Sequence, residues 1–189
     1  MPETTDDVSK KLQHPRRSLG NRHRSQAVKF LSLADSDSQN LEWAEQSARQ
    51  AVLHDFTNPQ NWRTLVQVKL ATGDDSGIRA VLNELFTILG RDPEALSQLD
   101  GVSMIESGSA ILEASLKADS LDPDEWWESV SQSDDALVEF IERVINLDLS
   151  DQRANLLFSR RLERVRDTGM EEQYLKLSRV LLAQRPSNH

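Results

Sequence analysis

The chain has 189 residues, no cysteine and a net charge of −9, and 38% of its residues are hydrophobic. This length and apolar content suit one folded domain or a short stack of repeats rather than a fully disordered chain. The lack of cysteine excludes disulfides, a thiolate metal site and a catalytic cysteine, and it is typical of a reducing compartment. Neither a signal peptide nor a run of about eighteen uncharged apolar residues is visible, so we expect a soluble, cytoplasmic protein.

The N-terminal residues differ in charge from the rest of the chain. Residues 1–29 contain seven Lys or Arg and three acidic residues, a net charge of +4, whereas the remaining 160 residues carry −13. Residues 1–24 have few apolar side chains to bury, so we expect them to form a disordered basic arm that precedes an acidic body.

A basic arm has several uses. Clustered cations bind phosphates, so one alternative function is a nucleic-acid-associated factor. The other interpretations are an arm that only aids solubility, or one that docks on an acidic protein surface, including its own body. They are favoured because the arm has no aromatic side chain to stack on a base. The nucleic-acid alternative would use Lys10, Lys11, Arg16, Arg17, Arg22 and Arg24.

Residues 58–93 have the pattern of a helical hairpin. Apolar residues from Trp62 to Leu70, and again from Ile78 to Leu89, recur at helical spacing. Asn58-Pro59 is suited to start the first helix, and Gly73 and Gly90 are suited to end the two helices. The sequence therefore predicts two amphipathic helices with a turn at Gly73.

The hairpin repeats along the chain. A shift of 34 residues places Ala44 on Ile78, Ala48 on Leu82 and Asn58-Pro59 on Asp92-Pro93, which makes residues 25–57 an earlier copy. Later copies are expected over 92–123, with Gly108 at the turn, over 122–148 and over 151–186. A period of this length is typical of a stack of helix-turn-helix units, so we expect an all-α protein of about ten helices over residues 25–186.

This unit resembles the tetratricopeptide repeat. Trp62, Leu65, Gly73 and Leu82 match that family's pattern best, and the last unit matches through Phe158, Leu162, Val165, Gly169, Tyr174, Leu181 and Pro186. Val66 stands where the family has Gly, and Arg161 where it has Leu. The resemblance implies a right-handed superhelix, an α-solenoid whose groove is lined by the first helix of each hairpin and binds a peptide or a partner helix.

The resemblance also implies where a partner would bind. Arg63 and Arg160 stand at positions where the family grips a peptide carboxylate, and Gln67 and Leu70 lie beside Arg63 in the groove. The alternative for both arginines is an ordinary solvated surface position, which is the more common one.

Trp126 and Trp127 are adjacent, so on a helix their side chains point about 100° apart and only one of them faces a given core. We expect Trp126 in the core and Trp127 at an interface; the alternative is that both pack. No metal-ligand spacing of histidines and no known catalytic motif is present, so we expect a non-catalytic interaction module without metal or cofactor. Its partner is a protein or peptide, and self-association remains open.

Overall fold

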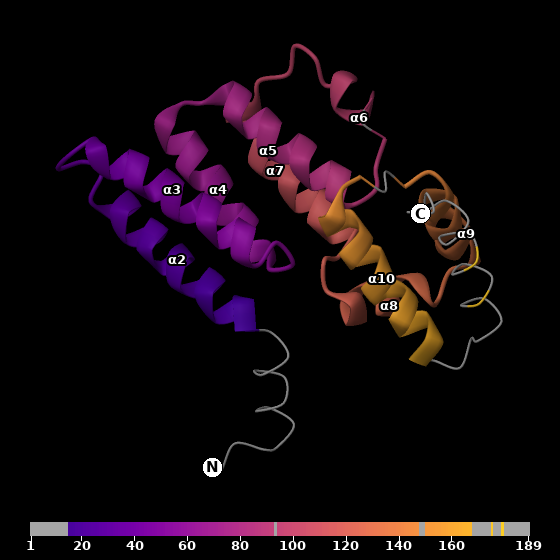
Figure 1. Ribbon diagram of the computed structural model, residues 1–189. Helices are drawn as coiled ribbons and strands as arrows, with labels where there is room; N and C mark the ends of the chain where they lie inside the picture. The colour runs from indigo at the N-terminus through magenta and orange to yellow at the C-terminus, as the bar shows by residue number, and fades with distance from the viewer. Residues whose placement is uncertain (1–14, 93, 148–149, 168–174, 176–178, 180–189) are drawn as a thin grey trace, which may run out of the picture. The chain divides into compact units, whose positions relative to one another are not determined.

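The computed structural model describes residues 15–92, 94–147 and 150–167, together with residues 175 and 179. Within these residues the protein is helical, with nine helices and no strand, which confirms the all-α prediction (Figure 1). None of them is both long and apolar enough to cross a membrane. The helices are α2 (Pro15–Ser32), α3 (Gln39–His54), α4 (Pro59–Thr72), α5 (Asp75–Ile88), α6 (Glu94–Ser97), α7 (Met104–Ala118), α8 (Pro123–Val130), α9 (Asp134–Ile145) and α10 (Gln152–Asp167).

The chain packs as two compact units. Of the described residues, those up to 81 and those from 103 to 109 form the first unit, and those from 82 to 102 and from 110 onward form the second. Helices α5 and α7 therefore contribute their first turns to the first unit and their later turns to the second.

The predicted hairpin 58–93 is confirmed as α4 and α5. The side chain of Asn58 accepts a hydrogen bond from the backbone N–H of Gln60 at 3.0 Å, and Pro59 occupies the first turn of α4. Gly73 and Gly90 have φ of 68° and 67°, the left-handed conformation that favours glycine at a helix end. Asn58-Pro59 and Gly73 therefore determine the two ends of α4, and Gly90 determines the end of α5.

The first unit is built on contacts among α2, α3 and α4, each of which touches the other two. Small side chains take part in this packing: Ala27 of α2 and Ala48 of α3 are fully buried. Trp62 is also fully buried, and its indole N–H donates to the carbonyl of Phe56 at 2.7 Å. Trp62 is thus both a core residue and an anchor for the loop before α4.

Helix α2 begins at Pro15, not near residue 25, so the expectation of a disordered arm is wrong for residues 15–24. Polar contacts replace the missing apolar stripe. The Arg17 Nε lies 3.3 Å from an Asp55 carboxylate oxygen, and Arg24 donates to the Asn61 side-chain oxygen at 3.0 Å. Gly20 is buried so closely that an added Cβ would lie 3.0 Å from the Asp55 Cβ. Residues 1–14 lie outside the described part of the chain.

The hairpin expected over 92–123 is also wrong in its details. Its first helix is reduced to the four residues of α6, and Gly108 lies inside α7 rather than at a turn. A Cβ at Gly108 would come within 2.5 Å of the Ile78 Cγ2, so the glycine allows close packing of α7 against α5 within the first unit. A glycine in a helical pattern can mark a close contact as readily as a break.

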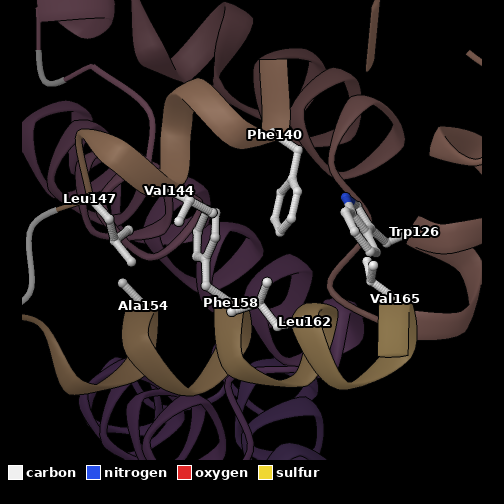
Figure 2. Packing of buried hydrophobic residues seen from close by; sticks show 8 residues of the cluster. All are labelled: Trp126, Phe140, Val144, Leu147, Ala154, Phe158, Leu162 and Val165. Atoms are coloured by element: carbon white, nitrogen blue, oxygen red, sulfur yellow. The ribbon is translucent and has the colours of Figure 1, made fainter. Parts of the chain in front are cut away.

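The second unit has a core of aromatic and aliphatic residues from α8, α9 and α10. Figure 2 shows this cluster, which runs from Leu147 and Ala154 at one end to Trp126 and Val165 at the other. The rings of Phe140 and Phe158 stack with their centroids 5.7 Å apart, and the ring centroid of Trp126 lies 4.7 Å from that of Phe140. The hairpin predicted over 122–148 is confirmed as the short helix α8 and the longer helix α9. The second helix of the hairpin 151–186 lies almost wholly outside the described residues.

Candidate functional site

Helix α4 is buried on one side and accessible on the other. Seven of its fourteen residues are buried. The open positions include Gln60, Arg63, Gln67 and Leu70, which follow the spacing of one helix face. Gln60 and Gln67 are exposed, whereas Arg63 and Leu70 are half-buried. The three predicted groove residues of this helix, Arg63, Gln67 and Leu70, therefore share a single accessible surface, which we call the α4 stripe.

The other two predicted groove residues, Trp127 and Arg160, belong to the second unit, whereas the α4 stripe belongs to the first. Trp126 is only 2% exposed, which confirms its core position. Trp127 is half-buried, packs against the same core and has its ring centroid 6.1 Å from that of Trp126. Its expected role at an interface is thus limited to the part of the ring that stays accessible. Arg160 is half-buried on α10.

The basic residues of the nucleic-acid alternative are divided in their roles. Lys10 and Lys11 lie outside the described residues. Arg17 and Arg24 contact Asp55 and Asn61, as described above, and Asn61 in turn donates to the Ala51 and Asp55 carbonyls at 3.1 and 2.9 Å. Arg16 and Arg22 are exposed. Half of the described arginines in this set therefore hold α2 in place.

The largely buried Lys69 forms an ion pair with the more exposed Asp74 in the first unit. The Lys69 side chain is 9% exposed; its Nζ contacts a Glu45 carboxylate oxygen and lies 3.1 Å from an Asp74 oxygen. Burial by itself would lower the pKa of Lys69, but hydrogen bonds with Glu45 and Asp74 outweigh it, so the pKa of Lys69 is raised. The hydrogen bonds from Lys69 and from the Gly77 N–H lower the pKa of Asp74. These charges fix the turn between α4 and α5, because Asp74 Oδ1 accepts from the Gly77 N–H at 2.9 Å.

Asp119 forms ion pairs with two arginines in the second unit. Arg91 donates to one of its carboxylate oxygens at 2.7 Å, and Arg143 donates to the other at 2.7 Å. The Asp119 side chain is only 8% exposed. Because Arg91 follows α5, Asp119 follows α7 and Arg143 lies on α9, this cluster joins three segments that are distant in sequence.

Arg161 lies next to this cluster and is 1% exposed. It donates to the Ser120 carbonyl at 3.1 Å, and its guanidinium carbon lies 5.1 Å from the Trp126 ring centroid and 5.2 Å from that of Phe158. Its Nε has no hydrogen-bond partner. Burial lowers the pKa of Arg161 to about 10, against the opposing effect of Asp119, so the side chain stays charged at neutral pH.

Arg161 departs from the repeat pattern, in which this position is Leu. The signal that points to its burial is a charged residue among the core positions Phe158, Leu162 and Val165. A guanidinium that stays protonated and is enclosed by aromatic rings serves as a packing and charge anchor rather than as a proton-transfer group.

No group of three or more His, Asp or Glu side chains among the described residues is arranged to hold a metal ion. No protein family, curated protein or solved structure shows significant similarity to the chain.

Proposed function

We propose that the protein is a non-catalytic protein-interaction or assembly module that binds a peptide or partner helix along the α4 stripe. The observation that carries the proposal is the one-sided burial of α4, which leaves Arg63, Gln67 and Leu70 together on its accessible side. A helix held so firmly presents its exposed side chains at fixed positions, which lowers the entropy cost of binding. The stripe combines a cation, an amide and an apolar side chain, so it suits an amphipathic segment with at least one carboxylate.

The arrangement of α2, α3 and α4 supports a tetratricopeptide-like α-solenoid as the scaffold. Each hairpin in such a stack covers its neighbour, and α4 touches both helices of the preceding hairpin. In such a stack the first helix of each hairpin lines the groove, and α4 is the first helix of its hairpin, so we expect the α4 stripe to face the groove. The cysteine-free sequence agrees with a cytoplasmic setting.

Binding through the basic arm to nucleic acid receives less support. Arg17 and Arg24 already contact Asp55 and Asn61, so they are not available to bind phosphates without loss of those contacts. We therefore place protein binding first.

The test is selection of binding peptides from a random display library on the full chain, followed by affinity measurements on two variants. Arg63→Glu reverses the charge on the α4 stripe. Arg49→Glu makes the same change at a half-buried arginine of α3 and serves as the control. We expect Arg63→Glu to weaken binding of the selected peptides about tenfold or more, because a charge-assisted hydrogen bond becomes a repulsion. Equal affinity for both variants, or no peptide selected, would exclude the α4 stripe as the binding surface.

A further inference from the structure

One face of α2 points away from its packing partners and is basic. Leu19, Arg22, Gln26 and Lys29 follow the i, i+3, i+7, i+10 spacing of a single helix face, and all four are exposed. Leu19 is 42% exposed, which is high for a large apolar side chain. Helix α2 as a whole contains five Lys or Arg and no acidic residue. Neither Arg22 nor Lys29 forms an ion pair with another described residue.

One face of α9 has the opposite charge at the same spacing. Asp135, Val138, Glu142 and Ile145 are exposed and again follow i, i+3, i+7, i+10. Val138 is 54% and Ile145 is 45% exposed. From Pro123 to Ile145 the chain has seven acidic residues and one arginine, so the charge around this face is strongly negative.

We propose that the exposed face of α2 in one molecule binds the exposed face of α9 in a second copy of the chain. Arg22 and Lys29 are seven residues apart, as are Asp135 and Glu142, so each pair spans about 10.5 Å along its helix. Both cations therefore meet both carboxylates in one contact, whichever way the helices run. In that contact the exposed apolar side chains of Leu19, Val138 and Ile145 lie at the helix–helix seam.

The chemistry of the two faces favours a second copy over an unrelated partner, because one chain supplies both complementary surfaces. The contact is heterologous, since α2 and α9 are different surfaces. Because each molecule carries both faces, the assembly either grows with concentration into a chain or closes into a ring, of which a dimer with two such contacts is the smallest. Two exposed ion pairs and a narrow apolar seam make the association reversible and sensitive to salt. It does not involve Arg63 or Gln67, so it stands independently of the α4 stripe.

The test uses two doubly charge-reversed proteins and sedimentation velocity up to about 0.5 mM protein, a range suited to weak contacts. Protein X carries Arg22→Glu and Lys29→Glu, so both of its faces are acidic. Protein Y carries Asp135→Lys and Glu142→Lys, so both of its faces are basic. All four positions are exposed, and circular dichroism and thermal melting verify that each protein keeps the wild-type fold.

The wild type should associate at about 50 mM NaCl and lose at least about tenfold in association constant at about 500 mM NaCl. X and Y alone should remain monomeric, and their equimolar mixture should associate. Net charge does not explain that recovery, because X at −13 and Y at −5 are both negative, given −9 for the wild type. A monomeric wild type at low salt, undiminished association of X or Y alone, or a mixture that stays monomeric would each overturn the proposal.

Discussion

Replacing Arg161 by methionine tests whether the buried guanidinium stabilises the second unit or is merely tolerated there. Burial lowers the pKa of Arg161 from its ordinary value to about 10, which corresponds to a cost of roughly 3 kcal/mol at neutral pH at about 1.4 kcal/mol per pH unit. Two cation–π contacts, with Trp126 and Phe158, offset about 1 kcal/mol each. The hydrogen bond to the Ser120 carbonyl contributes about 1 kcal/mol more.

These contributions nearly cancel, so Arg161→Met should change the free energy of unfolding by no more than about 1 kcal/mol, since methionine fills a similar space with a flexible apolar chain. The difference from the wild type should be the same at about pH 6 and pH 8. The folded-state pKa is lowered, so the cost is fully present below about pH 10 and declines only as the pH rises through that value.

The matched variant is Asp119→Asn, which has nearly the same shape but removes the carboxylate that Arg91 and Arg143 share. Loss of one partner from a buried charge cluster leaves the remaining charges unpaired, so we expect a loss of about 3 to 5 kcal/mol. Urea denaturation followed by circular dichroism measures both variants. A loss above about 2 kcal/mol for Arg161→Met, or a loss of less than about 1 kcal/mol for Asp119→Asn, would refute this account of the cluster.

Two further predictions concern the helix ends. Gly73 and Gly90 both have positive φ, but a Cβ at Gly73 meets nothing within 4 Å, whereas one at Gly90 lies 2.8 Å from the Phe158 ring. Gly73→Ala should therefore lower the free energy of unfolding by about 1 to 2 kcal/mol, and Gly90→Ala should lower it by about 1 to 3 kcal/mol more than Gly73→Ala does, as measured by urea denaturation. Equal losses for the two variants would contradict the close approach of Gly90 to Phe158. The pKa of Asp74 is lowered from 3.8 in the folded state, so its contribution to stability is present above that value and is lost as the pH falls through the folded pKa. Asp74→Asn should make unfolding less dependent on pH between about pH 5 and 2, as followed by acid titration of the circular dichroism signal, and an unchanged slope would contradict the ion pair.

The parts of the fold that the sequence predicted well depend on short-range signals. Asn58-Pro59, Gly73 and Gly90 determine helix ends within a few residues, so the hairpin α4–α5 was predictable. The core role of Trp126 was predictable because Trp126 follows Pro123 at the same distance as the buried Trp62 follows Pro59, and each proline starts a helix.

The parts that were missed depend on contacts between distant residues. Helix α2 extends back to Pro15 because Arg17 and Arg24 contact Asp55 and Asn61, which lie 38 and 37 residues later in the sequence. A local sequence pattern does not predict such contacts. In the sequence Gly108 resembles a turn signal. Only the folded structure shows that Ile78 packs against it and leaves no room for a larger side chain. The Asp119 cluster was unpredictable for the same reason, since Arg91 and Arg143 lie 28 and 24 residues from Asp119 in the sequence.

The most direct test of the central claim is site-specific photo-crosslinking from the α4 stripe. A benzophenone amino acid replaces Gln67 in the full chain and, in the control, Gln50, which is an exposed glutamine of α3 in the same unit. With peptides selected on the wild type, the account predicts adducts from position 67 that fall about tenfold when Arg63→Glu is added, and few adducts from position 50. Equal labelling from both positions, or labelling from position 67 that ignores Arg63→Glu, would contradict a binding surface on α4.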